Sequence, residues 1–429
     1  MSDPNARVDA VALHRSAMRA VRRGRLEDGR QMLETAVAAR PDWAQGLADL
    51  AQLQLMMGDE AAALASYERC VARDPSLPAA WLNLGTLMLR ADRVAEAGPC
   101  FEKAIAVDPG LADAHAGLGI AHQRQHRYTD AADALRRAAE LAPQDPEIRS
   151  NLGGVLHELG DHEAALARFE EAIALAPERG ALHAHVGVIR HEVEGAAAAL
   201  PHYDAALRLS PGHTHTLAAK HSALASLGRR AEAAQIFDYD ALIVPTQLTA
   251  AAGYPDMPAF NAALADHAVR HPTLMAEPVG KTTRGGSQTG HLLGAAAGPV
   301  ATLEGLIRTA IDAYFADAAR VTHPYCPRRP IPGRLFAWAT VLDRGGFQDA
   351  HIHPGGFLSG VYYVQVPEES EAGAIEFGRP APPFDLADPD TLLLRPKPGL
   401  LVLFPSFIWH RTIPFEGSAQ RISIAFDLM

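Results

Sequence analysis

The sequence contains only three cysteines, Cys70, Cys100 and Cys326, which stand far apart and form no Cys-x-x-Cys pair. A disulfide framework therefore has no support in the sequence, and the cysteine content is typical of a reducing compartment. The chain also lacks an apolar core near its N-terminus and any apolar run long enough to span a bilayer, so neither a signal peptide nor a membrane helix is expected. These absences predict a cytoplasmic protein.

Positive charge is scarce as well. The chain has 39 Lys and Arg residues against 50 Asp and Glu residues, which gives a formal net charge of −11. Phosphate backbones and anionic lipid surfaces attract clustered Lys and Arg, so we expect neither a nucleic-acid partner nor a membrane partner. The Gly-rich stretch at residues 280–290 lacks the GxxxxGK[ST] order of a phosphate-binding loop, and it predicts a structured loop instead.

Length and repetition are what the chain has in abundance. Its 429 residues predict two or more domains. In the first half prolines recur every 34 residues, at positions 41, 75, 109, 143, 177 and 211, and other residue types recur in phase with them. One complete set comprises Trp81, Leu84, Gly85, Ala97, Phe101, Ala104 and Pro109. Small residues allow two antiparallel helices to approach, an aromatic residue or leucine fills the gap to the next pair, and proline ends the second helix.

This pattern resembles the tetratricopeptide repeat family, with about seven repeats in phase over residues 10–237. The resemblance implies an N-terminal α-solenoid. Asn83 and Asn151 occupy the same position in their repeats, and in some peptide-binding members of this family asparagines at that position hold the backbone of the ligand. The other repeats carry Asp49, Gly117 and His185 there. Because the series of asparagines is interrupted, a scaffold and a groove for an extended peptide both remain open.

The period ends near Phe237, and we place a domain boundary there, with repeats in residues 1–237 and a second domain in residues 238–429. Two helices are expected in the second domain, at residues 258–271 and 301–319. Strands are expected at residues 335–342, 347–353, 360–366, 374–377, 391–395, 400–404 and 421–428. Short strands separated by Gly- and Pro-rich turns predict a double-stranded β-helix, that is, a cupin-like jelly roll with flanking helices.

Three histidines in this domain form a candidate metal site. His351 and His353 are two residues apart, so on a β-strand both side chains project from the same face. His410 follows the apolar strand expected at residues 400–404. Three neutral imidazoles from two strands suit a borderline divalent transition metal. Asp349 is interpreted as a solvated turn residue or as a group that supports a ligand.

Further along, Arg421 lies eleven residues beyond His410, and Ser423 lies two residues beyond Arg421. Together with the histidines, this order resembles the Fe(II)/2-oxoglutarate-dependent oxygenases, in particular a bacterial branch with His-x-His-Pro followed by Ser-Gly-Val-Tyr-Tyr. The resemblance covers about residues 236–429 and implies Fe(II) and 2-oxoglutarate as cofactors. It also implies that Arg421 and Ser423 bind the far carboxylate of the co-substrate, because a guanidinium matches a carboxylate in two parallel hydrogen bonds. Strand alternation points Tyr363 inward, so its hydroxyl is a further candidate contact.

One position departs from the family pattern. The first metal motif of the family is His-x-Asp or His-x-Glu, whereas this chain has His353 at the carboxylate position. Two assignments stay open. In the first, His351, His353 and His410 all bind the metal. In the second, only His353 and His410 bind it and Gly355 occupies the carboxylate position, as in oxygenases of the aspartyl β-hydroxylase type.

The resemblance implies a hydroxylase that converts 2-oxoglutarate to succinate and CO2. The expected substrate is a peptide or protein side chain, docked partly by the repeats. Two alternatives remain. One is a small-molecule hydroxylase whose repeats serve assembly, and the other is a non-catalytic repeat adaptor with a degenerate cupin domain.

Overall fold

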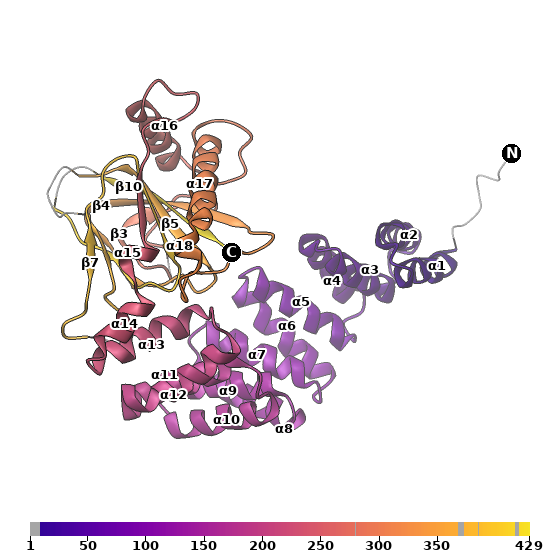
Figure 1. The fold of residues 1–429 in the computed structure, drawn as a ribbon. Coiled ribbons are helices and arrows are strands. Elements are labelled where there is room, and N and C mark those ends of the chain that lie inside the picture. The colour runs from indigo at the N-terminus through magenta and orange to yellow at the C-terminus, as the bar shows by residue number, and fades with distance from the viewer. Residues whose placement is uncertain (1–8, 279, 368–372, 385, 417–419) are drawn as a thin grey trace. The chain divides into compact units, whose positions relative to one another are not determined.

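The fold is described from a computed structural model, which places residues 9–278, 280–367, 373–384, 386–416 and 420–429. The chain divides into two compact units, Met1–Pro177 and Glu178–Met429 (Figure 1). In these described ranges no helix is both long enough and apolar enough to cross a membrane.

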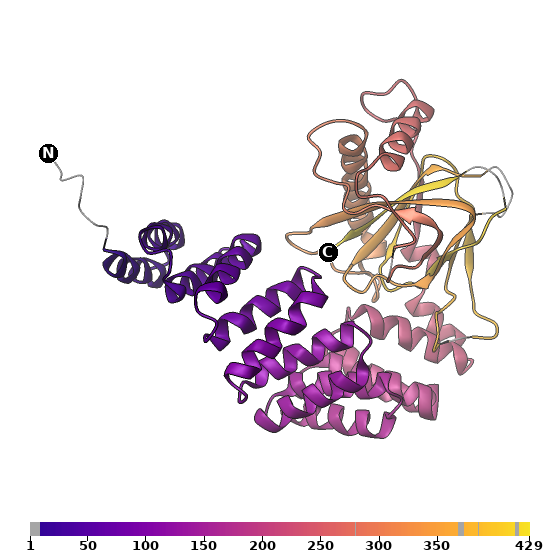
Figure 2. The same cartoon turned by 180° about the vertical axis from the view of Figure 1, so that it is seen from behind.

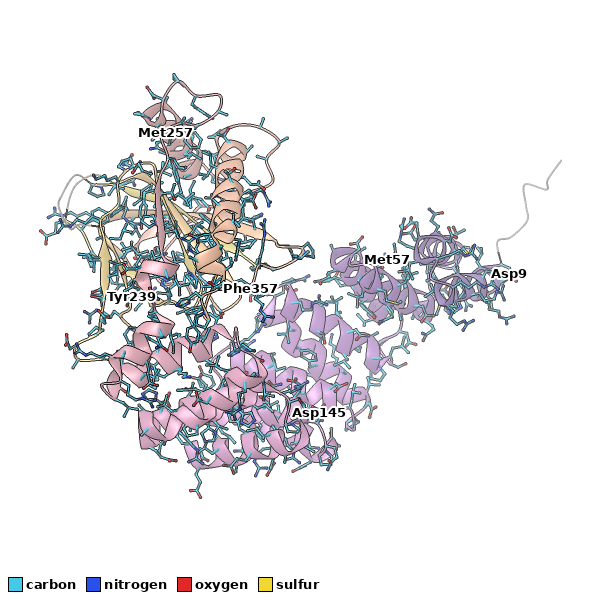
Figure 3. The ribbon with its side chains drawn as sticks, in the orientation of Figure 1. Asp9, Met57, Asp145, Tyr239, Met257 and Phe357 are labelled. Carbon is cyan, nitrogen blue, oxygen red and sulfur yellow. The ribbon has the colours of Figure 1, made fainter. Side chains whose placement is uncertain are left out.

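The first unit is built from pairs of helices, in which each odd-numbered helix packs against the helix that follows it (Figure 1). Its helices are α1 (Ala10–Arg22), α2 (Leu26–Ala39), α3 (Ala44–Met56), α4 (Glu60–Arg73), α5 (Pro78–Arg90), α6 (Val94–Val107), α7 (Ala112–Arg124), α8 (Tyr128–Leu141), α9 (Pro146–Glu158) and α10 (His162–Leu175). Asp9 and Asp145, labelled in Figure 3, begin α1 and α9 by accepting hydrogen bonds from backbone amides of the first turn. The helix pairs expected from the 34-residue period are confirmed.

Glycine allows the aromatic ring of each pair to lie against the neighbouring helix. A Cβ atom at Gly85 would lie 2.9 Å from the ring of Phe101, within the same pair. The same ring reaches the next pair, because a Cβ at Gly117 would lie 2.4 Å from it. Since real Cβ atoms do not approach other atoms this closely, both positions require glycine. This packing also explains why Gly117 interrupts the series of asparagines.

The second unit begins with two more helix pairs and continues into further helices. Its helices are α11 (Gly180–Glu194), α12 (Ala196–Leu209), α13 (Thr214–Ser226), α14 (Arg230–Ile236), α15 (Tyr239–Leu242), α16 (Met257–Val269), α17 (Pro299–Ala316) and α18 (Ala318–Val321). The expected helices at 258–271 and 301–319 are confirmed as α16 and α17. Buried residues of α12, α13 and α14 belong to one hydrophobic core together with buried residues of the β-sheet. The boundary predicted at Phe237 therefore lies inside this unit, and it stays a prediction.

The β-domain is a single curled antiparallel sheet, as expected for a double-stranded β-helix. Its strands are β1 (Val244–Gln247), β2 (Met275–Ala276), β3 (Thr283–Gln288), β4 (Leu335–His351), β5 (Leu358–Gln365), β6 (Ile375–Phe377), β7 (Leu392–Leu394), β8 (Leu400–Pro405), β9 (His410–Thr412) and β10 (Arg421–Leu428). They are ordered β1-β8-β5-β10-β4-β9-β6-β7, with β3 beside β4 and β2 beside β3. β4 pairs with β10 along its first half and with β9 at its end, so it connects the two walls of the sheet.

The strands near the Gly-rich stretch differ from the expectation. Residues 280–290 are predicted to form a loop, whereas Thr283–Gln288 form strand β3, which pairs with β4. The sequence predicts two strands, at residues 335–342 and 347–353, whereas the structure has the continuous strand β4. The strand continues through Gly345 and Gly346 because β3 runs close beside it: a Cβ at Gly346 would lie 2.5 Å from the carbonyl oxygen of Gly285. Two glycines that look like a turn in the sequence thus serve a close approach of two backbones.

The two faces of the sheet contact different helices. Ile422, Ile424 and Phe426 of β10 point outward and share a core with residues of α16 and α17. Figures 1 and 2 show these two helices beside the sheet. Val361 and Tyr363 of β5 point inward and share the core of α12, α13 and α14. Figure 3 labels Met257 at the start of α16 and Tyr239 at the start of α15, where the chain passes from the helix pairs into the sheet.

A buried histidine of α13, His221, is expected to make the free energy of unfolding depend on pH. His221 is 3 % exposed, its ring stacks on Phe237 at 3.6 Å, and burial lowers its pKa to about 3. In the unfolded chain its pKa returns to about 6.5, so the unfolded state takes up a proton first as the pH falls. The stability that depends on neutral His221 is complete above pH 6.5 and is lost progressively toward pH 3. Between pH 6.5 and 5 the expected loss is about 2 kcal/mol.

Between pH 7 and pH 5 we expect the free energy of unfolding of the His221→Leu protein to fall by about 2 kcal/mol less than that of the unmodified chain. Urea unfolding at pH 7 and at pH 5 measures the difference, and the other histidines cancel in the comparison. Equal losses in the two proteins would contradict the prediction.

Candidate metal centre

The structure brings the three predicted histidines together. Each offers a ring nitrogen, and these nitrogens all lie within 4.8 Å of one another. His351 ends β4 and pairs across the sheet with His410, the first residue of β9, so their ring centres lie 4.3 Å apart. The ring of His353, two residues beyond β4, lies 5.1 Å from that of His351 and 5.0 Å from that of His410. Strand pairing and the two-residue spacing together produce this convergence.

The second nitrogen of each ring is held by the protein. The Nδ1 atom of His351 lies 2.7 Å from the carbonyl oxygen of Asp349, and that of His410 lies 3.0 Å from the carbonyl oxygen of Ile408. Because a carbonyl only accepts hydrogen bonds, both Nδ1 atoms carry the proton and both Nε2 atoms carry a lone pair. The Nδ1 atom of His353 lies 2.5 Å from Oδ1 of Asp427. Such contacts orient imidazoles that bind a metal through Nε2.

Burial keeps the imidazoles of His351 and His410 neutral. Removal from water lowers the pKa of His351 to about 3, with the neighbouring His353 as a smaller cause, and lowers the pKa of His410 well below its usual range. Neutral imidazole is the form that binds metals, and three nitrogen donors suit a borderline divalent cation. Gly355 lies in the turn after His353, and nothing lies within 4 Å of a Cβ built on it. The convergence supports the three-histidine assignment.

Arg421 is buried on the inner face of the sheet, with 1 % of its surface exposed. Its Nε donates to the carbonyl oxygen of Gly373 at 2.9 Å, its Nη1 donates to Oγ of Ser423 at 3.2 Å, and its guanidinium carbon lies 5.0 Å from the centre of the Tyr363 ring. Ser423 stands opposite Thr340 on β4 and Tyr363 on β5, so these residues form a row across three strands. The guanidinium therefore faces hydroxyl-bearing side chains on the same face as the histidines.

The surroundings of Arg421 suit an anion. Among the placed residues no carboxylate lies within ion-pair distance of its guanidinium, and a buried charge without a partner is costly. The hydroxyls of Tyr363 and Thr340 are buried and complete no hydrogen bond with a described residue. Burial lowers the pKa of Arg421 and raises that of Tyr363 to about 12. A dicarboxylate that reaches from the histidines to Arg421 would satisfy these groups.

A cavity of about 630 Å³ opens beside the histidines. His351 and His353 are in its wall, and Phe336 and Trp338 of β4 supply apolar surface, with the Trp338 ring 5.6 Å from that of His353. Lys281 is the one lysine or arginine of its described lining and Asp427 the one acidic side chain. The candidate metal site therefore borders this cavity.

The remaining predicted residues lie in the first unit and are not brought together. Asn83 is on α5 and donates a hydrogen bond to the Tyr67 hydroxyl at 3.1 Å, whereas Asn151 is on α9. The helix between them in repeat order, α7, carries Gly117 at this position. Their role in binding a partner stays a prediction.

Asp427 and its neighbour Ser359 are not among the residues predicted from the sequence. The signal was present, since the two-residue alternation that points Arg421 and Ser423 inward continues to Asp427, and the one that points Tyr363 inward reaches Ser359. Which residues meet across the strands depends on strand register, and the alternation alone does not give it.

Comparison with protein families places known models on both parts of the chain. A family described as "Putative 2OG-Fe(II) oxygenase" matches residues 336–427, which include all three histidines and Arg421. The tetratricopeptide repeat family matches residues 14–78 and 153–214. The middle TPR-like domain of cilia and flagella-associated protein 70 matches residues 47–176. A search of curated proteins gave no match.

Several solved structures resemble the repeats. YrrB, a TPR protein with an unusual peptide-binding site, is 26 % identical with a TM-score of 0.39, and the match covers 44 % of this chain and 97 % of YrrB. A tetratricopeptide repeat protein from Parabacteroides merdae is 16 % identical with a TM-score of 0.45 over 53 % of this chain and 91 % of the other. MamA from Desulfovibrio magneticus is 22 % identical with a TM-score of 0.38 over 41 % and 99 %. The chain therefore combines N-terminal tetratricopeptide repeats with a C-terminal domain of the 2OG-Fe(II) oxygenase family.

Proposed function

We propose that this chain is an Fe(II)- and 2-oxoglutarate-dependent dioxygenase that hydroxylates a side chain of a peptide or protein. One observation carries the proposal: three imidazoles held through Nδ1 converge on the same inner face as a buried guanidinium that lacks a described carboxylate partner. A degenerate cupin domain would have no reason to retain both features, because each is costly to bury without its ligand.

For each group that such an enzyme must bind, this chain has candidate residues. His351, His353 and His410 would hold Fe(II), and Arg421 with Ser423 and Tyr363 would hold the far carboxylate of 2-oxoglutarate. When bound, the two cofactors supply oxygen activation coupled to decarboxylation of 2-oxoglutarate to succinate and CO2, with hydroxylation of the substrate.

The protein contributes orientation and the exclusion of water. Phe404 and Phe377 pack against His410, with ring centres 4.8 Å and 6.2 Å from its own, and they fix the plane of that imidazole. Arg421 lies in a dry region of the inner face, where hydrogen bonds to a carboxylate are stronger than in water. The open cavity on the other side leaves room for a substrate side chain.

The cavity favours a substrate side chain without positive charge. Asp427, the one acidic side chain of the described lining, already accepts hydrogen bonds from His353 and Ser359 through Oδ1, so it is a weaker partner for a lysine or arginine substrate than an unengaged carboxylate. Phe336 and Trp338 offer flat apolar surfaces instead. An aliphatic, aromatic or amide side chain fits this lining better than a cationic one.

The experiment that tests the function is succinate formation by the purified, Fe(II)-loaded chain, with and without cell lysate. Mass spectrometry of the lysate proteins would then locate a gain of about 16 Da, the mass of one oxygen atom. We expect lysate protein to raise the rate of succinate formation. A loaded protein that neither binds 2-oxoglutarate nor consumes it would overturn the proposal, and zinc occupancy without turnover would favour the adaptor.

A truncation separates docking by the repeats from chemistry. A protein of residues 178–429 retains α11 to α14 and the core that they share with the sheet. We expect its substrate-independent consumption of 2-oxoglutarate to stay within about threefold of that of the full chain, since the whole site lies in this unit. Hydroxylation of a protein substrate should fall at least about tenfold if the missing repeats supply docking contacts. Full activity of the truncated protein on a small molecule would support the alternative hydroxylase.

A further inference from the structure

Asp427 is a partly buried carboxylate that contacts one candidate metal ligand, His353, and no lysine or arginine among the described residues. Its side chain is 14 % exposed and that of His353 is 11 % exposed, and their Oδ1 and Nδ1 atoms lie 2.5 Å apart. Carbonyl oxygens hold the Nδ1 atoms of the other two histidines. His353 alone thus has an anionic partner, and His353 is also the residue that stands where the family pattern has a carboxylate.

A chain of hydroxyls fixes this carboxylate. Oγ of Ser359 donates to Oδ1 of Asp427 at 2.6 Å, and the hydroxyls of Ser359 and Ser406 lie 2.8 Å apart. Because the proton of Ser359 points at Asp427, Ser406 is the donor to Ser359. The hydrogen bonds therefore run in one direction, from Ser406 to Ser359 and from Ser359 to Asp427. Asp427 also accepts a hydrogen bond from Nδ1–H of His353. This arrangement leaves a lone pair on Nε2 of His353.

Strand pairing and a nearby turn bring Asp427, Ser359 and Ser406 together, as strand pairing does for the histidines. Asp427 on β10 stands directly opposite Ser359 on β5, so the contact follows from strand register. Gly356 leaves the space that the network occupies, since a Cβ there would lie 2.5 Å from Oγ of Ser406 and 3.5 Å from Cγ of Asp427. The backbone amide of His353 also donates to the carbonyl oxygen of Ser406 at 3.0 Å. Two strands and the turn after His353 therefore meet at Asp427.

We propose that Asp427 supplies the negative charge of this metal centre indirectly, by holding Nδ1–H of His353 and making that imidazole a stronger donor. The proposal rests on the metal site of the proposed function. A carboxylate hydrogen-bonded to a ligating imidazole fixes its tautomer and raises its basicity. His353 with Asp427 thus replaces the single Asp or Glu of the usual motif, and Asp427 is a positioning residue that acts through His353.

Two substitutions separate charge from geometry. Asp427→Asn keeps an oxygen that accepts from His353 but removes the charge, whereas Asp427→Ala removes both. The control is Asp349→Asn, which removes an equal charge next to the centre. The carboxylate of Asp349 faces Arg284 at 3.0 Å, and only its backbone carbonyl, which the substitution retains, contacts a histidine.

The first measurement is the affinity of the full-length metal-free protein for Co(II), by calorimetry and by the visible absorption of the bound ion. We expect about tenfold weaker binding in Asp427→Asn, about 100-fold weaker binding in Asp427→Ala, and less than about threefold change in Asp349→Asn. Thermal unfolding of the metal-free proteins checks that each variant is folded. If wild-type protein bound no Co(II), the proposed function would fail. If wild type and Asp427→Ala bound it equally, only the role of Asp427 would fail.

The second measurement observes His353 directly. Co(II) shifts the proton resonances of its ligands far outside the usual range, so the Nδ1–H protons of the three ligands appear as separate exchangeable signals. We expect three such signals in the wild type and in Asp427→Asn. In Asp427→Ala the signal of His353 should disappear through rapid exchange with water while the other two persist. A purely structural role for Asp427 predicts that all three signals remain, and that result would overturn the proposal.

Discussion

His410→Ala is expected to reduce Fe(II)-dependent consumption of 2-oxoglutarate to the background rate. His410 is 6 % exposed, and its ring centre lies 4.3 Å from that of His351 and 5.0 Å from that of His353, so its loss leaves at most two nitrogen donors for a metal. We expect a loss of at least about 10³-fold, since metal-free protein has no route to oxygen activation. Succinate formation under saturating Fe(II) and 2-oxoglutarate measures it.

A matched control and a second variant make this result specific. His267→Ala removes a histidine from α16, on the outer side of the sheet, and should leave the rate unchanged. His351→Ala decides between the two ligand assignments: the rate falls like that of His410→Ala if three histidines bind the metal, and is largely retained if Gly355 occupies the carboxylate position. Normal turnover by His410→Ala would show that this histidine is not a ligand.

Arg421→Met is expected to weaken 2-oxoglutarate binding by at least about 10²-fold while leaving metal binding intact. The buried guanidinium offers charge-assisted hydrogen bonds, each of which contributes about 1.5–3 kcal/mol, so the loss of two weakens binding by about 10²-fold to 10⁴-fold. Methionine fills much of the same volume without burying a charge, so we expect the metal-free protein to remain folded. Calorimetric titration of 2-oxoglutarate into Mn(II)-loaded protein measures the change.

Arg379→Met is the control for this second prediction. Arg379 is a partly exposed arginine of the same domain that pairs with Glu376 and contacts none of the candidate residues. Its replacement should change 2-oxoglutarate affinity by less than about threefold, because Glu376 keeps its ion pair with Arg411. If the Arg421→Met protein bound 2-oxoglutarate as tightly as the unmodified chain, the co-substrate would not bind at Arg421, even if the substitution changed turnover.

The repeat architecture and the three histidines are accessible from the sequence because their signals are local or periodic. The 34-residue period needs no knowledge of the partner helix, and the His-x-His spacing places two side chains on one face by geometry alone. His410 is a candidate because it follows an apolar strand, and the resemblance to the oxygenases then adds a role for Arg421, which lies far from the first motif in the chain.

The structural features that cannot be predicted from the sequence are those that depend on contacts between distant segments. Strand β4 continues through two glycines because Gly285 of β3 lies beside them, and no pattern within β4 reveals this. Asp427 meets His353 because β10 and β5 are in one particular register. The shared core of α12 to α14 with the sheet is hidden for the same reason, since these helices keep the residue pattern of ordinary repeats.

That shared core also bears on how such a protein can change during evolution. The described residues of that core all belong to the second unit, so the number of helix pairs before Gly180 can vary without replacing any of them. Recombination at Phe237, where the sequence period ends, would separate Tyr203 and Leu217 from the sheet residues with which they share a hydrophobic core. The last two pairs are therefore inherited with the oxygenase, and their sequences should diverge at the pace of an enzyme domain.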